Sequence, residues 1–168
     1  FRLVNERLSV KDFDLREGFS KIGDTLLGDI GGSMGPLYGS FFTEMADTLD
    51  GTDTLDRDRL AAMLQAGESA ITDLGEAKPG DKTLIDVLTP ARLAYAKAAD
   101  DGDDFAGCLQ ALKTASAQGL EATRDMVAKL GRAARLGERS RGHLDAGAYS
   151  CNLILQALAE GLLTRLTA

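Results

Sequence analysis

Apolar side chains recur at steps of three and four residues along most of the chain, and this spacing places them on one face of an α-helix. Leu37, Phe41, Met45 and Leu49 form one such row. No stretch alternates apolar and polar residues with enrichment in β-branched or aromatic types, which is the pattern of a half-buried strand. The sequence therefore predicts an all-α fold.

The other predicted helical faces share this spacing. They are Leu15, Phe19, Ile22 and Leu26; Leu60, Met63, Leu64, Gly67, Ile71 and Leu74; residues 83–99, with Leu84, Leu88 and Tyr95 inward; the longest seam, Phe105, Leu109, Leu112, Ser116, Gly119, Thr123, Met126 and Leu130; and residues 147–166, with Leu153, Ile154, Leu158, Leu162 and Leu166. Pro90 predicts a kink within residues 83–99. Similar helix lengths and short connectors favour antiparallel neighbours in an up-and-down bundle.

Two acidic connectors, LDGTDTLDRD at 49–58 and KAADDGDD at 97–104, have the composition of solvated loops. Their Asp and Thr residues are candidates for helix N-caps. At the other end of the chain, the sequence begins with Phe1 rather than Met, and Phe1, Val4 and Leu8 have the spacing of a helix that is ending. We therefore expect residues that precede Phe1 to be absent from this sequence.

Size and charge exclude several classes of protein. A chain of 168 residues has the size of one domain, and its formal net charge is −7. This charge argues against a general nucleic-acid or membrane-surface protein, because its field repels phosphate polymers. We find neither a membrane-spanning apolar run nor a signal-peptide pattern. Cys108 and Cys151 fall in apolar helical stretches, so we expect buried thiols in a reducing compartment, the cytoplasm.

A glycine-rich connector, GDIGGSMGPLYG at 28–39, separates two predicted helices. Its glycines permit positive φ and close backbone approach, and Pro36 suits the first turn of a helix. Such a helix start offers free N–H groups and the positive end of the helix dipole, and Ser33 adds a hydroxyl. The connector predicts either a phosphate site or a tight turn between crossing helices, and it lacks the Walker pattern.

Two further connectors carry charge. LGEAKPGDKT at 74–83 is compatible with a turn that presents polar groups and with a charged surface turn before a helix. GRAARLGERSRGHLDAGAYS at 131–150 holds Arg132, Arg135, Arg139 and Arg141 beside Glu138 and Asp145, together with the only histidine, His143. The arginines can form a self-satisfied ion-pair cluster, or an arginine fork can bind phosphate while Asp145 orients a donor or cation. A lone histidine more often serves structure than catalysis.

Three blocks, GGSMGPLYG, LGEAKPGDKT followed by IDVLTP, and GRAARLGERSRGHLDAGA, occur here in one order and at characteristic separations. In these blocks the chain resembles the DhaL family, the nucleotide-binding subunit or domain of dihydroxyacetone kinases, over essentially its whole length. The resemblance implies a closed all-α barrel of antiparallel helices, about seven or eight in the intact protein, with ADP or ATP held at one rim by the connecting loops. It also implies that residues 1–168 form one nucleotide-binding domain.

The resemblance assigns residues of all three blocks to the nucleotide and none to catalysis or to a metal. They are Gly31 and Gly32 at the phosphates, Ser33 and Met34 against the nucleotide, Gly75 and Leu84 on the base side, Arg132 at the phosphates, and Asp145 with Gly147 closing the loop. Two positions depart from the family pattern: Arg141 stands where an apolar residue is common, and Ala146 where proline is common.

A larger departure concerns magnesium. Family members carry, upstream of the position of Phe1, a motif of the type G-D-x-D-H-G-x-N-M and a further aspartate, whose carboxylates bind the Mg²⁺ ions that bridge the phosphates. This sequence has no such motif. Because Mg²⁺ needs a near-octahedral set of oxygens, we expect the chain as it stands to hold neither ADP nor Mg²⁺, and the intact protein to bind both.

The resemblance implies a subunit of a phosphoenolpyruvate-dependent dihydroxyacetone kinase. It would take a phosphoryl group from a DhaM-type partner through bound ADP/ATP and pass it to dihydroxyacetone on a DhaK-type subunit, in the cytoplasm and without nucleic acid. Three alternatives stay open: the nucleotide domain of an ATP-dependent dihydroxyacetone or related sugar kinase, a non-catalytic nucleotide-binding regulator, and a helical interaction domain. A homodimer is compatible with the sequence.

Overall fold

The helical spacing of the sequence corresponds to helix in the computed structural model, which describes residues 2–9, 13–49, 51 and 54–167. These residues form seven α-helices and two 3₁₀ helices and contain no strand, which confirms the all-α prediction. Phe1 and the connector residues 50, 52 and 53 lie outside the described part of the chain. The chain divides into two compact units, Phe1–Glu76 and Ala77–Ala168.

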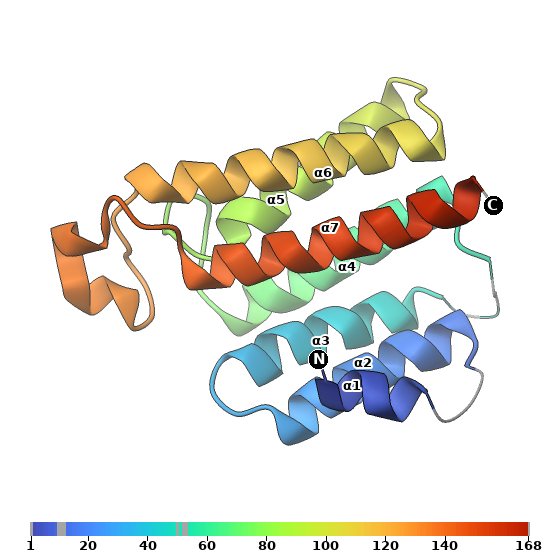
Figure 1. Ribbon diagram of the computed structural model, residues 1–168, viewed down its shortest axis with the longest axis horizontal. Coiled ribbons are helices and arrows are strands. Elements are labelled where there is room, and N and C mark those ends of the chain that lie inside the picture. Colours follow the sequence, from blue (N-terminus) through green and yellow to red (C-terminus); the bar gives the residue numbers. More distant parts are fainter. Residues whose placement is uncertain (1, 10–12, 50, 52–53, 168) are drawn as a thin grey trace. The chain divides into compact units, whose positions relative to one another are not determined.

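In the first unit, each helix packs against the next one along the chain: α1 (Arg2–Leu8), α2 (Leu15–Asp29), α3 (Met34–Asp47) and α4 (Arg57–Leu74). Figure 1 shows α2 and α3 as an antiparallel pair joined by a short loop. The carboxylates of Asp14 and Asp56 cap α2 and α4 by accepting N–H hydrogen bonds of 2.7 and 2.8 Å. Such caps typically stabilise a helix by about 1 kcal/mol.

Large apolar side chains hold the first unit together. Phe41, Met45, Leu60 and Met63 are almost fully buried, and burying each side chain contributes about 1.5–3 kcal/mol. α2 and α3 approach closely at Gly23, where a Cβ atom would lie 3.0 Å from the carbonyl oxygen of Gly39. The aromatic and sulfur-containing row predicted for this segment therefore forms a core.

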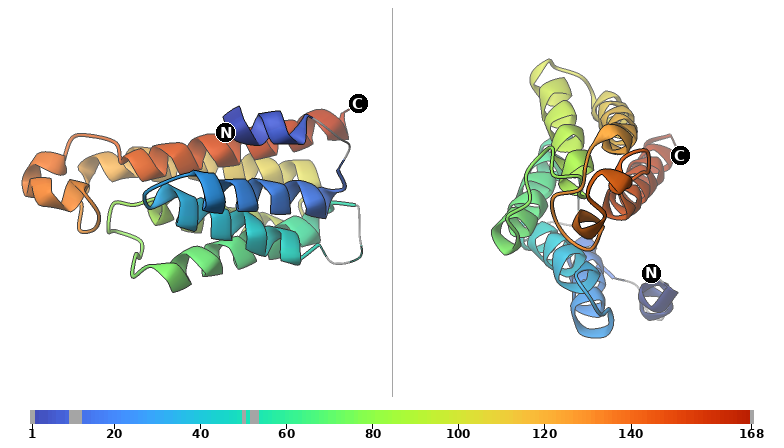
Figure 2. Two further views of the ribbon diagram at one scale, coloured as in Figure 1. Left: turned by 90° about the horizontal axis from the view of Figure 1, so that it is seen from below. Right: turned by 90° about the vertical axis from the view of Figure 1, so that its left-hand side faces the viewer.

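In the second unit, α5 (Ile85–Asp100), α6 (Phe105–Ala122) and α7 (Ala146–Leu166) each pack against the other two. Figure 2 shows these three helices side by side from two further directions. Leu88 and Tyr95 are buried as predicted, and α5 continues through Pro90. Gly119 lets α6 approach α5, because a Cβ atom there would lie 3.1 Å from the Cα of Val87.

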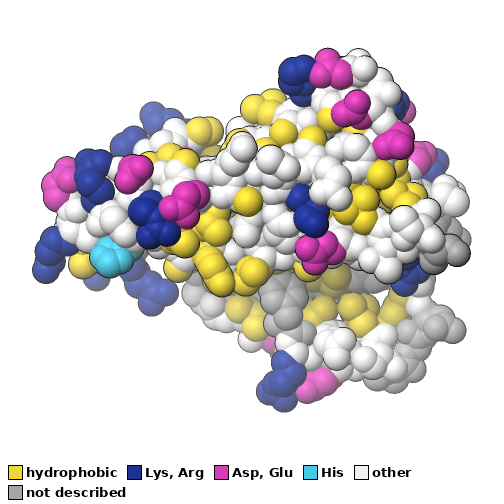
Figure 3. Space-filling model, turned by 45° about the horizontal axis from the view of Figure 1, so that its top comes forward, with side chains coloured by type: hydrophobic (Ala, Val, Ile, Leu, Met, Phe, Trp, Pro, Cys, Tyr) yellow, Lys and Arg dark blue, Asp and Glu magenta, His cyan; other side chains and the backbone are white. Residues whose placement is uncertain are grey.

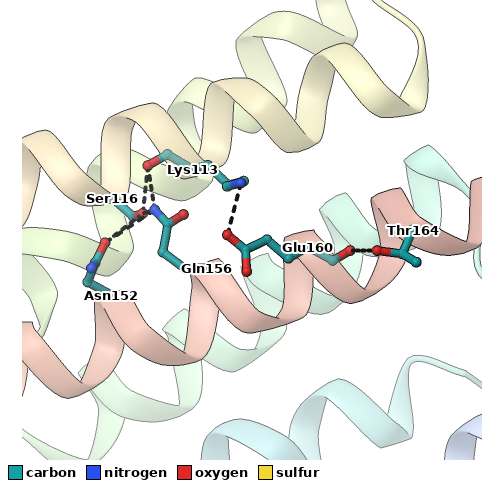
Figure 4. A network of polar contacts seen from close by, with 6 residues as sticks. All are labelled: Lys113, Ser116, Asn152, Gln156, Glu160 and Thr164. Atoms are coloured by element: carbon teal, nitrogen blue, oxygen red, sulfur yellow. Dashed lines mark hydrogen bonds and ion pairs between the residues drawn. The ribbon is translucent and has the colours of Figure 1, made fainter.

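A polar seam fixes the register between α6 and α7 (Figure 4). The Gln156 amide donates to the Lys113 carbonyl oxygen at 2.8 Å and to the Ser116 hydroxyl at 2.9 Å, and that hydroxyl lies 3.0 Å from Asn152 Oδ1. Further along, Lys113 pairs with Glu160 at 3.2 Å. Because a shift of one helical turn would leave these groups without partners, the seam allows one alignment of the two helices.

Three sequence predictions are corrected. The seam predicted to continue to Leu130 ends at Ala122, where η1 (Thr123–Asp125) begins. In α7 the buried row is Ala148, Cys151, Leu155 and Ala159, not the row of larger side chains, of which Leu153 and Leu166 are exposed. Leu74, the last residue of α4, is also exposed. The buried face of α7 carries mainly small residues, and these let α7 pack closely against α5 and α6.

The two cysteines are buried as predicted, Cys108 on α6 and Cys151 on α7. Within the described residues, no helix combines the length and the apolar character that crossing a membrane requires.

Candidate functional site

The loop between α2 and α3 exposes the start of a helix. Gly32 has φ +75°, which favours glycine, whereas Gly31 stands in open space at an ordinary φ. Gly35 has a packing reason, because a Cβ atom there would lie 2.8 Å from the Leu26 carbonyl oxygen. Ser33 is the N-cap residue of α3, but its hydroxyl makes no cap hydrogen bond. Ser33 and Met34 are exposed, so the loop offers a hydroxyl and N–H groups to a ligand.

The connector before α5 ends in a buried polar cluster, so the interpretation as a charged surface turn holds for the exposed Glu76 and Lys78 but not for Asp81 and Lys82. Asp81, Lys82 and Asp86 are each less than 6% exposed. The Asp86 carboxylate accepts N–H hydrogen bonds from Gly80 at 2.5 Å and from Thr83 at 2.7 Å. These bonds fix the turn that leads into α5. Three charged residues around one turn also occur in solvated loops, so the sequence did not reveal that this cluster is buried.

Lys82 lies at the centre of this cluster. Its φ of +61° is the one positive φ outside glycine among the described residues. Its ammonium group donates to the carbonyl oxygens of Met126 and Ser140, at 3.1 and 2.5 Å. Two distant points of the chain thus meet at one buried cation.

The segment that follows α6 is a folded loop that contains η2 (Ala133–Ser140), and η2 is interrupted at Gly137. The Ser140 hydroxyl closes the base of this loop, accepting from the Ala128 N–H at 2.9 Å and donating to the Gly137 carbonyl at 2.6 Å. The Gly142 N–H donates to the Arg124 carbonyl oxygen at 2.8 Å. The loop is therefore held by hydrogen bonds rather than by a hydrophobic core.

The arginines of this loop differ in their contacts. Arg141 pairs with Glu138 at 3.1 Å and also donates to the Asp125 carbonyl oxygen. Within the described residues, Arg132, Arg135 and Arg139 make no ion pair, and all three are exposed. Figure 3 shows lysine and arginine side chains gathered around the only histidine, which is also exposed. Of the four arginines in the predicted ion-pair cluster, only Arg141 therefore pairs with a carboxylate of the described chain. The guanidinium groups of the other three are free to bind an anion.

Asp145 begins α7. Its Oδ2 accepts the Ala148 N–H at 2.8 Å, and its own N–H donates to the Thr123 hydroxyl at 3.1 Å. A Cβ atom on Gly147 would lie 3.5 Å from the Leu84 nitrogen and 3.0 Å from Asp145 Oδ2. The structure thus brings Leu84, Asp145 and Gly147 together in the second unit. Gly75, which ends α4, belongs to the first unit with residues 31–34, and their meeting with Arg132 stays a prediction.

The described residues do not provide a magnesium site. They contain no group of three or more His, Cys, Asp or Glu side chains arranged to hold a metal. Asp145, which the sequence offered to orient a donor or cation, uses one carboxylate oxygen to cap α7. Because Mg²⁺ requires several oxygens in octahedral geometry, the described residues by themselves do not fit it.

The fold and these loops define an all-helical protein with a helix start and unpaired arginines suited to an anionic ligand. A family model, the DAK2 domain, matches residues 1–160. The chain therefore belongs to the DAK2 domain family.

Several proteins similar to this chain are named as kinases or as kinase subunits. The ADP-binding subunit DhaL of PEP-dependent dihydroxyacetone kinase 2 from Listeria innocua is 36% identical over 96% of this chain and 76% of that protein. The ADP-binding subunit DhaL of the Escherichia coli PEP-dependent dihydroxyacetone kinase is 34% identical over 95% of this chain and 76% of its own length. Human triokinase/FMN cyclase is 36% identical over 85% of this chain and 24% of that protein.

Proposed function

We propose that the protein is the ADP-binding subunit of a PEP-dependent dihydroxyacetone kinase. In this role a phosphoryl group passes from a DhaM-type partner to the bound ADP, and from the resulting ATP to a hydroxyl of dihydroxyacetone on a DhaK-type subunit, which regenerates ADP. The support is the similarity to DhaL subunits along nearly the whole chain. The two cysteines are free and buried, which is compatible with the reducing environment of the cytoplasm.

One observation carries the proposal: Arg132 is exposed and has no ion pair within the described chain, yet it lies on a loop whose base is closed by hydrogen bonds. A guanidinium group on an ordered loop can donate two parallel hydrogen bonds to a phosphate. Positioning and charge neutralisation are what phosphoryl transfer requires of a protein.

The other residues have supporting roles in this proposal. Gly31 and Gly32 let the backbone approach the phosphates, while Ser33 and Met34 lie against the nucleotide. Leu84 and Gly147, which are neighbours in the second unit, would border the nucleotide, and so would Gly75 at the end of α4. Asp145 would hold the start of α7 in place. When bound, the nucleotide supplies the phosphoryl-accepting group. A Mg²⁺ ion would accompany its phosphates, with ligands other than the described residues alone.

A reconstituted assay tests the proposal. Full-length protein is mixed with DhaK-type and DhaM-type partners and phosphoenolpyruvate, and phosphorylation of dihydroxyacetone is measured together with retained ADP. We expect transfer that depends on all three proteins. Transfer from ATP without the DhaM-type partner would favour an ATP-dependent kinase, bound ADP without transfer a regulator, and absence of ADP a helical interaction domain.

A further inference from the structure

We propose that Lys82 is a positioning residue that holds the Arg132 loop in its phosphate-binding conformation. This inference rests on the proposed function and concerns a residue that the family resemblance did not assign to the nucleotide. Lys82 acts through Arg132 and does not itself contact the phosphates.

The two acceptors of the Lys82 ammonium flank the loop. Met126 O precedes it and Ser140 O ends it, and Arg132 lies between them. A single cation therefore joins the two ends of residues 126–140. Removing it would leave two carbonyl oxygens without their shared donor, and the loop would lose one of the contacts that close its base.

A lysine at position 82 has two local free-energy costs. Burying an ammonium group is unfavourable unless its hydrogen bonds are replaced, and within the described residues Lys82 pairs with no carboxylate, only with the two carbonyl oxygens. Its φ of +61° would suit glycine better. Glycine would avoid both costs at this position, so the contribution of the lysine lies in the contacts of its side chain.

Neighbouring contacts hold the same base. The Lys129 N–H donates to the Asp81 carbonyl oxygen at 3.1 Å, and the Ala128 N–H donates to the Ser140 hydroxyl at 2.9 Å. All of these bonds lie at the ends of the loop. Within the loop, the Arg135 N–H donates to the Arg132 carbonyl oxygen at 3.3 Å, so the position of Arg132 depends on how these ends are held.

A double-mutant cycle on the full-length protein tests this inference. ADP affinity is measured calorimetrically, with Mg²⁺ present, for wild type, Lys82→Met, Arg132→Ala and the double variant. We expect Lys82→Met to weaken ADP about tenfold in the wild-type background and less than about twofold in the Arg132→Ala background, because the two residues act as one unit. Lys97→Met, which removes an exposed lysine on α5, is the matched control and should bind ADP like wild type.

Folding is checked separately. Circular dichroism should show unchanged helix content, and hydrogen exchange should show faster exchange of the Ala128 amide in Lys82→Met. If Lys82→Met does not fold, Lys82→Gly replaces it, because glycine adopts the same φ without strain. Equal losses in both backgrounds, or no loss from Lys82→Met, would overturn the inference alone. A wild-type protein that binds no ADP would overturn the proposed function and this inference with it.

Discussion

Asp81 and Lys129 form an ion pair between positions 48 residues apart, with Oδ1 and Nζ at 3.1 Å. The other carboxylate oxygen of Asp81 accepts the Lys78 N–H at 3.0 Å. The Lys78 hydrogen bond, and then the Lys129 hydrogen bond and charge, lower the pKa of Asp81 below its ordinary value. The pair therefore ties the connector before α5 to the loop that carries Arg132.

This relationship predicts a pH dependence. Because the pKa of Asp81 is lower in the folded protein, its stabilising contribution is complete above the ordinary value of 3.8 and is lost as the pH falls through the folded pKa. NMR titration of the Asp81 carboxyl carbon should give a midpoint below 3.8. In the same pH range the Lys129 amide should exchange faster in wild type, with no such change in Asp81→Asn. A midpoint at or above 3.8 would contradict the prediction.

Arg132→Ala in the full-length protein should weaken ADP binding by about 1.5–3 kcal/mol, the scale of a charge-assisted hydrogen bond. Arg132→Lys should restore only part of this, because an ammonium group cannot make the two parallel bonds of a guanidinium group. Calorimetric titration with ADP measures both. Arg139→Ala, at another exposed arginine of the same loop, shows whether the loss is specific to Arg132 or follows the charge of the loop. Unchanged affinity of Arg132→Ala would remove this residue from the site.

Two glycine substitutions should have opposite effects on stability. Gly35→Ala places a Cβ atom 2.8 Å from the Leu26 carbonyl oxygen, so it should destabilise the protein by about 1–3 kcal/mol. Gly18→Ala adds a methyl group in open space within α2 and should stabilise it by about 0.5–1 kcal/mol. Urea unfolding gives both values. Equal effects would mean that α2 and α3 are not in close contact at Gly35.

We predict that the three glycine-rich connectors gather at one end of the protein, from the helices that separate them in sequence and from the family resemblance. Spin labels introduced by Ser33→Cys and Arg139→Cys should lie closer together than labels introduced by Ser33→Cys and Asp101→Cys. Asp101 follows α5 at the far end of the second unit, and an 18-residue helix such as α6 spans about 27 Å. The reverse order of distances would show that residues 31–35 and 132–147 lie at opposite ends.

Much of the fold was determined by local sequence. Helical periodicity predicted the second to seventh α-helices because the period of 3.6 is a property of the segment itself. Asp56 and Asp104 were recognisable as caps for the same reason, since a cap bonds only three residues ahead. The free guanidinium groups of Arg132, Arg135 and Arg139 could also be proposed from composition, though only as one of two interpretations.

Tertiary contacts decided what the pattern left open. The apolar spacing continues through Met126 and Leu130, yet α6 ends at Ala122. The Thr123 hydroxyl donates to Leu120 and accepts the N–H of Asp145, and the Met126 carbonyl oxygen, which a continuing helix would pair with a following N–H, accepts a hydrogen bond from Lys82 instead. A partner 44 residues away in sequence leaves no periodic trace. The buried cluster around Lys82 was invisible for the same reason: a charged residue resembles a solvated one until the chain folds over it and replaces its water with carbonyl oxygens.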